Sequence, residues 1–344
     1  MQIQQNISLR PYNTFGVNVA CRQFAAFQNT DELIELLNSG NIGKSGVLIL
    51  GGGSNMLLTK NLDSFVLKND IKGIEELHED KDFVYVRAGA GENWHEFVSY
   101  CTSKGWAGLE NLSLIPGNVG ASPMQNIGAY GVEVKDLFWD LEALHLKEKK
   151  IQTFTLMDCA FGYRDSIFKN KYKDQFVILN VTFRLRKRPI FHTNYGAITQ
   201  ELERMRVTDL SIKAIAEAII NIRSSKLPDP KLIGNAGSFF KNPLVKRTLF
   251  EKLKKQYPGI VGFDNPDGTV KLAAGWLIEQ CGPAEDISWK GYRVGDVGCY
   301  PKQALVLVNY GNATGTEVFD LSTQIVQSVR TKFNVTLERE VNVI

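Results

Sequence analysis

Two glycine-rich segments contain residue types that suit the binding of a large ligand. The first consists of Gly51, Gly52, Gly53, Ser54 and Asn55. Glycine permits positive φ angles and close approach of the backbone to a ligand, and successive exposed N–H groups bind anions such as a pyrophosphate. A plain glycine turn explains the same residues equally well.

The second segment is the long, nearly uncharged stretch 115–131. Its candidate ligand-binding residues are Pro116, Gly117, Gly120, Ala121, Ser122, Gln125, Asn126, Gly128 and Ala129. Small side chains leave room for a large planar ligand, and the Ser, Gln and Asn side chains can hydrogen-bond the polar edge of a heterocycle. An uncharged surface loop of this length is uncommon unless something covers it, so ligand binding is favoured over a plain loop.

Three further positions offer chemistry and also have simpler explanations. Arg164, beside aromatic residues, can be a fixed cation for an anionic substrate or intermediate, or a surface arginine paired with Asp165. Ser238 places a hydroxyl on a constrained turn, but no G-x-S-x-G motif makes it a hydrolase nucleophile. Glu338, in an apolar-flanked strand, is either a shielded acid or a solvated glutamate.

The elements that must position these residues follow from the apolar patterning. Helices are predicted from Thr30 to Gly40 and over 92–104, 209–225, 247–256, 273–281 (ended by Gly282) and 317–333; strands are predicted over 47–50, 83–87, 137–147, 151–155, 176–185 and 304–309. The run at 47–50 is expected to be buried on both faces. The mixture predicts an α+β protein, with a domain boundary near Pro228 and Pro230.

Composition restricts the class of protein further. The 344 residues are 44% hydrophobic and 22% charged with a net charge of +3, which is typical of a globular protein and gives no sign of nucleic-acid binding. No apolar stretch approaches the roughly 18 residues of a membrane span, and no signal peptide is visible. Five scattered cysteines indicate reduced thiols in a cytoplasm rather than disulfides, and no metal site is expected.

Taken together, the motifs resemble one family over nearly the whole chain. They are YNTFG at 12–16, GGGSN at 51–55, IPGNVGASPMQNIGAYG at 115–131, FGYRDSIFK at 161–169, SSKLPDPKLIGNAGSFFKNP at 224–243, AAGWLIEQCG at 273–282 and LEREV at 337–341. The family is UDP-N-acetylenolpyruvoylglucosamine reductase. The resemblance implies noncovalently bound FAD in a fold of the vanillyl-alcohol-oxidase/p-cresol-methylhydroxylase type, followed by a substrate-binding α+β domain.

The resemblance also implies three domains and a set of site residues. The domains are residues 1–70, to which 332–344 return, 71–225 with an inserted tyrosine loop, and 226–331. Arg164 matches the active-site arginine, Ser238 the proton donor and Glu338 the catalytic glutamate. Substrate contacts are implied or suggested for Tyr130, Tyr195, Arg223, Lys226, Lys241, Asn242 and Gln303. Arg339 stands where the family usually has proline, and we expect no effect on the chemistry because the carboxylate of Glu338 is intact.

The implied reaction is the reduction of an enolpyruvyl ether on a UDP-sugar, with NADPH as reductant, in a cytoplasmic monomer. Hydride addition at C3 drives negative charge toward a dianionic enolate, which requires a fixed cation, hydrogen-bond donors and a proton for C2. Two other interpretations remain at this point: an FAD-dependent alcohol or lactone oxidase of the same fold, and a flavin-binding module without catalysis.

Overall fold

The computed structural model describes residues 2–40, 42, 43 and 45–344 and divides into two compact units. The first unit contains residues 1–7, 21–52 and 62–225, and the second contains 8–20, 53–61 and 226–344. Met1, the first residue of the predicted domain 1–70, lies outside the described residues. Each unit is described by itself.

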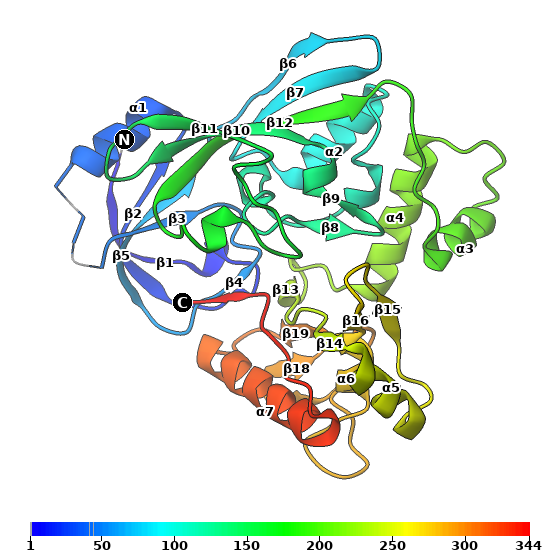
Figure 1. The fold of residues 1–344 in the computed structure, drawn as a ribbon. Coiled ribbons are helices and arrows are strands. Elements are labelled where there is room, and N and C mark those ends of the chain that lie inside the picture. The colour runs from blue at the N-terminus through cyan, green and yellow to red at the C-terminus, as the bar shows by residue number, and fades with distance from the viewer. Residues whose placement is uncertain (1, 41, 44) are drawn as a thin grey trace. The chain divides into compact units, whose positions relative to one another are not determined.

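The first unit contains a small sheet built around parallel strands (Figure 1). Its order is β1 (Gln4–Ser8), β2 (Ala20–Phe27), β5 (Leu62–Asn69) and β3 (Val47–Leu50). Helix α1 (Thr30–Asn38) connects β2 to β3, and Asn29 caps it by accepting a hydrogen bond from the Glu32 N–H. Because β3 is an edge strand, only Leu50 is buried, so the expectation of burial on both faces of 47–50 is wrong.

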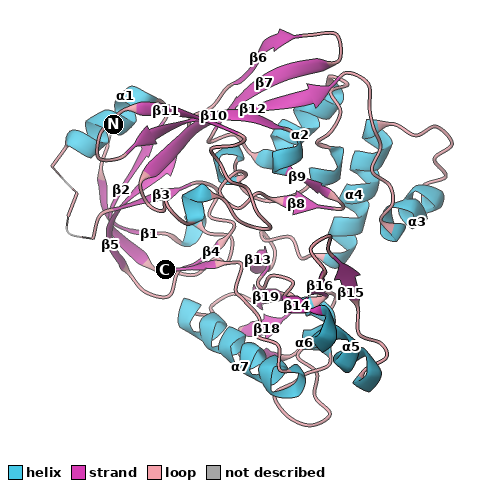
Figure 2. Ribbon diagram, viewed as in Figure 1, coloured by secondary structure: helices cyan, strands magenta, loops and turns pink. Residues whose placement is uncertain are grey.

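A larger antiparallel sheet forms the centre of the first unit (Figure 2). Its order is β11 (Ile151–Thr155), β10 (Phe138–His145), β12 (Phe176–Arg186), β7 (Phe83–Gly89) and β6 (Ile74–Glu79). Helix α2 (Trp94–Ser103) packs on this sheet, with the rings of Trp94 and Phe97 5.8 and 5.0 Å from that of Phe183. This core holds the loop 115–131 through short elements: η2 (Glu110–Leu112), η3 (Val119–Ala121), β8 (Gly128–Ala129) and β9 (Val132–Glu133).

Two helices after β12 form a separate apolar cluster in the first unit. They are α3 (Gly196–Arg204) and α4 (Ile212–Lys226), and Ile198, Ile215 and Ile219 are fully buried between them. Tyr130 and Phe191 pack against this cluster. The isoleucine spacing that predicted a helix over 209–225 therefore reflects the face of α4 that packs against α3.

The second unit contains two antiparallel sheets. One has the order β13 (Gly234–Ser238), β19 (Val306–Asn309), β18 (Val297–Cys299) and β17 (Arg293–Val294); the other has β14 (Leu244–Lys246), β16 (Thr269–Leu272) and β15 (Gly262–Asp264). The helices are α5 (Arg247–Gln256), α6 (Ala274–Glu279) and α7 (Gly315–Phe333). The C-terminal strand β20 (Asn342–Val343) pairs in parallel with β4 (Met56–Leu57).

The predicted mixture of helices and strands is confirmed, with local corrections. Helix α6 ends at Glu279 with Gln280 as its C-cap, so Gly282 does not end it. A Cβ at Gly282 would lie 1.3 Å from the carbonyl oxygen of Ile287, and this close approach explains the glycine instead. Strands β2, β5 and β6 and helix α3 were not predicted from the sequence.

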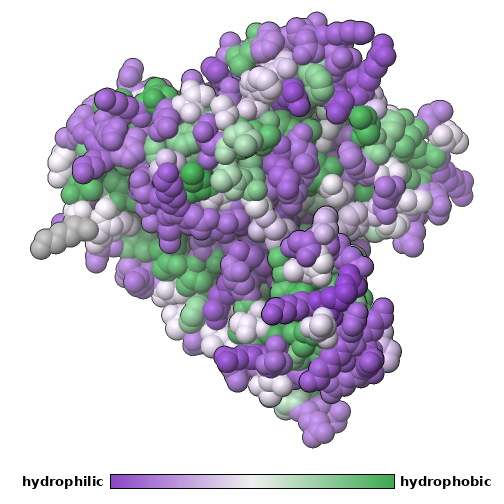
Figure 3. All heavy atoms as spheres, viewed as in Figure 1, coloured by the Kyte–Doolittle hydropathy of each residue, from purple (hydrophilic) through white to green (hydrophobic). Residues whose placement is uncertain are grey.

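The surface is mainly hydrophilic on the face drawn in Figure 3, with apolar side chains in separate areas. The most exposed large apolar residues, Met157 and Leu232, are far apart in the sequence. Among the described residues, no helix combines the length and the hydrophobicity that a membrane crossing requires.

Helix α7 begins with a capping box whose acidic member makes a testable contribution to stability. The Glu317 carboxylate accepts hydrogen bonds from the Thr314 N–H and hydroxyl at 2.7 and 2.8 Å, and these bonds lower its pKa below the ordinary value of 4.5. A group with a lowered folded-state pKa stabilises the protein above its unfolded pKa, and the contribution is lost as the pH falls through the folded value. We therefore expect Glu317→Ala to lower the free energy of unfolding by about 0.3–1 kcal/mol at pH 7, with the difference shrinking as the pH falls below the unfolded-state pKa of about 4.3 and lost below the folded-state pKa.

Urea unfolding at pH 7 and at pH 3.5 measures both quantities. Asp320→Ala is the control, because Asp320 is exposed on the same helix beyond the first turn. An equal loss of stability in both variants, or a Glu317→Ala effect independent of pH, would contradict the assignment.

Candidate active site

The two glycine-rich segments meet in the first unit. A Cβ at Gly52 would lie 2.7 Å from the Oδ1 atom of Asn118 and 3.0 Å from the Cα atom of Gly117. A side chain at residue 52 would therefore displace the loop 115–131. The structure brings the first half of the GGGSN motif against the second loop, as one extended ligand would require.

The second loop is held by the turn that follows β7. The N–H groups of Val119 and Gly120 donate to the carbonyls of Glu92 and Ala90, both at 2.9 Å, and a Cβ at Gly120 would lie 2.5 Å from that of Ala90. Trp94 donates its N–H to the Gly117 carbonyl at 2.9 Å. The turn after β7 and the second loop thus lie close together at Ala90 and Gly120, where only small residues fit.

Two polar side chains of this loop are buried for different reasons. Asn126, fully buried, donates to the Glu133 carboxylate at 2.9 Å and to the Gly162 carbonyl at 3.0 Å, and accepts from the Lys135 N–H. The Ser122 hydroxyl is also buried but has no hydrogen-bond partner in the structure. Asn126 therefore has a structural role, while Ser122 retains the capacity to bind a ligand.

The side chain of Arg164 extends to the loop 115–131 from a backbone position with positive φ. Its φ angle is +54°, its Nη2 atom donates to the Gly128 carbonyl at 2.6 Å, and the guanidinium lies 5.4 Å from the centre of the Tyr163 ring. Asn126 fixes the neighbouring Gly162 carbonyl. The neighbouring Asp165 carboxylate accepts from the Asn170 side chain at 3.0 Å.

Three of the predicted substrate contacts gather near Arg164 in the first unit. The rings of Tyr130 and Tyr195 are 5.9 Å apart at 77°, and Arg223 donates from Nε to the Leu114 carbonyl at 3.2 Å. Burial lowers the pKa of Arg223; Tyr130 opposes this shift and the charge of Arg164 adds to it. Burial raises the pKa of Tyr130. Two guanidinium groups that repel each other create a positive potential suited to an anion.

Two residues that support this cluster were not identified from the sequence. Asn111, fully buried, donates to the carbonyls of Tyr130 at 3.0 Å and His192 at 2.8 Å. His95 accepts from the Leu114 N–H at 3.1 Å, and its pKa is lowered by burial and by Arg223. No sequence signal could have found them, because their partners are 19 and 81 residues away.

The second unit holds Ser238 and Glu338. Ser238 ends β13 and is exposed. Residues 239–241 pair with 338–340: Lys241 donates its N–H to the Glu338 carbonyl and Glu340 to the Phe239 carbonyl, both at 2.9 Å. The Lys241 ammonium lies 2.5 Å from the Glu338 carboxylate, whose side chain is 72% exposed. Glu338 lies outside the named strands. Because its side chain is exposed, the interpretation of Glu338 as a shielded acid is wrong for this structure.

The remaining predicted residues of the second unit have separate surroundings. Asn242 accepts from the Ala274 N–H at 2.9 Å, at the start of α6, and Gln303 accepts from the Leu305 N–H at 3.2 Å. The Gln303 Oε1 atom is 3.0 Å from where a Cβ at Gly275 would lie, so it borders the same helix end. Lys226 is the exposed last residue of α4.

Asn55, predicted to bind the cofactor, makes contacts with the C-terminal segment in the second unit. Its side chain donates to the Glu340 carbonyl at 3.3 Å, and its own carbonyl accepts from the N–H and the side chain of Asn342. These contacts fix residues just after Glu338, so the structure gives Asn55 a supporting function that the sequence did not suggest.

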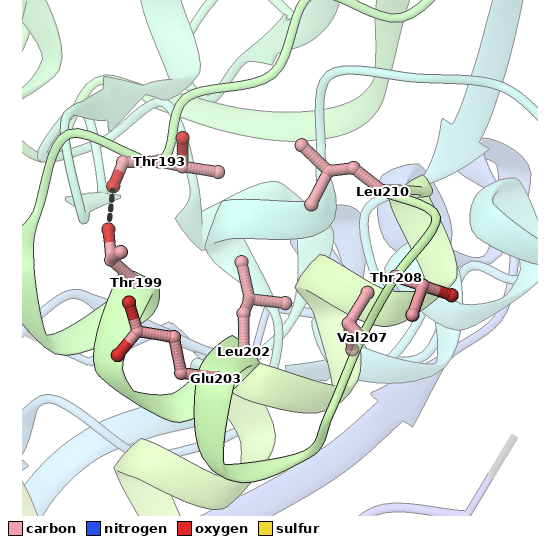
Figure 4. A pocket seen from close by; sticks show the side chains of 7 residues that line it. All are labelled: Thr193, Thr199, Leu202, Glu203, Val207, Thr208 and Leu210. Atoms are coloured by element: carbon pink, nitrogen blue, oxygen red, sulfur yellow. Dashed lines mark hydrogen bonds between the residues drawn. The ribbon is translucent and has the colours of Figure 1, made fainter.

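One small cavity of about 180 Å³ lies elsewhere in the first unit, beside α3 (Figure 4). It is lined by Thr193, Thr199, Leu202, Glu203, Val207, Thr208 and Leu210, and the Thr199 hydroxyl donates to the Thr193 carbonyl at 3.1 Å. None of the predicted site residues lines it. It offers no nucleophile or cation cluster, so the chemistry is assigned to the loops described above.

The class of protein follows from the first unit together with its family match. A family model described as "FAD binding domain" matches residues 22–147, which contain both glycine-rich segments, so the chain is an FAD-dependent oxidoreductase. A second family model, "UDP-N-acetylenolpyruvoylglucosamine reductase, C-terminal domain", matches residues 229–344. The chain belongs to the UDP-N-acetylenolpyruvoylglucosamine reductase family.

Relatives named as this reductase match the whole chain. Those of Flavobacterium johnsoniae and Amoebophilus asiaticus are 48% and 50% identical with complete coverage of both chains, and that of Pseudomonas putida is 48% identical over 99% of each. The crystal structure of the Thermus caldophilus reductase is 22% identical, covers 100% of this chain and 99% of its own, and has a TM-score of 0.68. The predicted fold class is confirmed.

The residues present fit FAD on their own geometry. The close approach at Gly52 and Gly117 excludes side chains there, as a pyrophosphate bound by backbone N–H groups would require, and the buried, unpartnered Ser122 hydroxyl can hydrogen-bond the flavin. These residue assignments remain predictions.

The contact at Gly52 yields a test of the cofactor assignment. We expect Gly52→Ala to weaken FAD binding at least about tenfold, equivalent to about 1.4 kcal/mol, because its Cβ would displace the backbone of the second loop. Flavin absorbance per protein after purification, followed by fluorescence titration of the apoprotein with FAD, measures the change. Gly43→Ala is the control, since a Cβ there meets nothing within 4 Å; equal FAD affinity in both variants would refute the assignment.

Proposed function

We propose that this chain catalyses the NADPH-dependent reduction of UDP-N-acetyl-3-O-(1-carboxyvinyl)-glucosamine to UDP-N-acetylmuramate, a step of peptidoglycan precursor synthesis. Membership in the reductase family over the full chain supports the reaction. The observation that carries the residue roles is the pairing of 239–241 with 338–340, which places Glu338 and Lys241 next to the strand end that bears Ser238.

The two glycine-rich loops would hold FAD through backbone groups. When bound, the cofactor would supply the hydride, drawn from NADPH, that C3 of the enolpyruvyl group requires. The lack of charge in these loops leaves the electrostatics of the reaction to Arg164 and the residues around it. Small side chains also leave room for NADPH and the enolpyruvyl UDP-sugar to bind at this site in turn.

Arg164 is assigned the stabilisation of the charge that develops on C2 and the substrate carboxylate. Its guanidinium is fixed by the Gly128 carbonyl and the Tyr163 ring, so it need not reorganise during the reaction. Arg223, close enough to feel the charge of Arg164, is assigned to an anionic part of the substrate. The pair Tyr130 and Tyr195 is assigned to the sugar-nucleotide, with Lys226, Asn242 and Gln303 as further contacts.

Ser238 is assigned the transfer of a proton to C2. Its hydroxyl is exposed at the end of β13, so water can replace the proton after each turnover. A hydroxyl is a weak acid and requires a nearby positive charge. Lys241 supplies this charge three residues away in the sequence, and Glu338 holds the ammonium group through the 2.5 Å contact.

The oxidase alternative requires a general base where this chain has Arg164 and Ser238. A flavin-binding module without catalysis would require neither residue. We further propose that the chain acts as a monomer in the cytoplasm. The scattered cysteines, typical of reduced thiols, support the cytoplasm, and the family resemblance supports the monomer.

The visible spectrum tests the reaction directly. Under anaerobic conditions, NADPH should bleach the flavin bands of the holoenzyme, and the enolpyruvyl UDP-sugar should restore them with formation of UDP-N-acetylmuramate. Reoxidation by oxygen but not by this substrate would favour the oxidase. A protein that does not react with NADPH would favour the binding module.

Ser238→Ala tests the proton donor. We expect the flavin to be reduced by NADPH at the wild-type rate, while reoxidation by the enolpyruvyl UDP-sugar falls by about 10²–10⁴, because only the second half-reaction needs a proton at C2. Stopped-flow absorbance measures both steps.

Ser103→Ala is the matched control, since Ser103 is exposed at the end of α2 and donates only to the Tyr100 carbonyl. Slower flavin reduction by NADPH in Ser238→Ala, with normal reoxidation, would exclude the proposed role.

A further inference from the structure

Arg339 fastens the segment that follows Glu338 to helix α7. Its Nε atom donates to the Ser322 hydroxyl at 2.8 Å, and its Nη2 atom donates to the Thr323 hydroxyl at 2.7 Å. The guanidinium also lies 4.4 Å from the centre of the Phe319 ring. All of these residues belong to the second unit.

The two hydroxyl groups are oriented to accept from Arg339. Ser322 and Thr323 each donate their own hydrogen to the Phe319 carbonyl, at 2.6 and 3.0 Å. Their lone pairs therefore remain for the guanidinium, and Ser322 is fully buried. Burial lowers the pKa of Arg339, as expected for a cation enclosed by uncharged partners. Uncharged partners fix the geometry of Arg339 without neutralising it.

The backbone of Arg339 connects this anchor to the site. Arg339 pairs with Phe240, and the hydrogen bonds on either side run between Lys241 and Glu338 and between Glu340 and Phe239. The side chain of Arg339 thus holds α7, while the adjacent residue Glu338 holds the Lys241 ammonium. Residues 334–341 contain no helix or named strand, so this segment is held by buried side chains such as Leu337 and by its contacts with other elements, of which the Arg339 anchor is one.

We propose that Arg339 is a positioning residue for the reduction step: its bonds to α7 fix the Glu338–Lys241 pair in register beside Ser238. The inference rests on the proposed function, which assigns that pair to proton transfer. It revises the sequence-based expectation that arginine at this position has no effect on the chemistry. Lysine cannot reproduce the contact, because a single ammonium lacks the planar fork that reaches two hydroxyls and a ring together.

The test compares Arg339→Ala and Arg339→Lys holoenzymes with wild type in the two half-reactions. We expect flavin reduction by NADPH to be unchanged and kcat for reduction of the enolpyruvyl UDP-sugar to fall about tenfold in Arg339→Ala, because small misplacements of catalytic groups cost rate. KM for this substrate should change less than twofold, and Arg339→Lys should restore kcat only in part.

Arg330→Ala is the control for the loss of one positive charge, since Arg330 is exposed on the same helix. If Arg339→Ala lowers only the melting temperature, with kcat intact below the transition, Arg339 is structural and the inference is wrong. Should Arg339→Ala fail to fold, Ser322→Ala with Thr323→Val replaces it, because this pair removes the same two acceptors while keeping the arginine. Normal kcat in that double variant would equally overturn the inference.

Glu338→Gln separates this inference from the proposed function. A large loss of kcat in Glu338→Gln together with normal kcat in Arg339→Ala would refute the positioning role alone. Full activity in Glu338→Gln would refute the assigned role of the Glu338–Lys241 pair, and the inference with it.

Discussion

Close approach of backbone segments at Gly52, Gly117 and Gly120 is the constraint on which the rest of the cofactor site depends. A Cβ at Gly52 would meet Asn118 and Gly117, and a Cβ at Gly120 would meet Ala90. The loop 115–131 therefore presents main-chain groups, which are small, uncharged and fixed by the turn after β7. A ligand with a pyrophosphate and a large planar ring suits such a surface. Backbone N–H groups can bind the pyrophosphate, and small side chains leave room for the ring.

This constraint also explains how Arg164 is placed. Asn126, buried within the loop, bonds to the Gly162 carbonyl, and Arg164 returns a bond to the Gly128 carbonyl. The cation is thus tied twice to the loop that is assigned to the flavin. In an oxidoreductase that must stabilise an enolate, a cation whose position follows that of the cofactor avoids the cost of reorganisation.

The second unit uses a different device, in which an irregular C-terminal segment is restrained at several points. Residues 338–340 pair with 239–241, Asn55 holds the Glu340 carbonyl, and Arg339 reaches α7. No single element supplies the Glu338–Lys241 contact. It results from three contacts that come from distant parts of the sequence.

The sequence by itself determined the family, the α+β class and the loops assigned to FAD, because these depend on local residue types: glycines, uncharged polar side chains and motifs of contiguous residues. It also located most helices, whose apolar faces repeat within each segment. Tertiary structure alone decided the exposure of Glu338, the edge position of β3 and the contacts of Asn55, Asn111 and Arg339. Each of these depends on partners that are remote in the chain, and no local pattern records which distant backbone a side chain will meet.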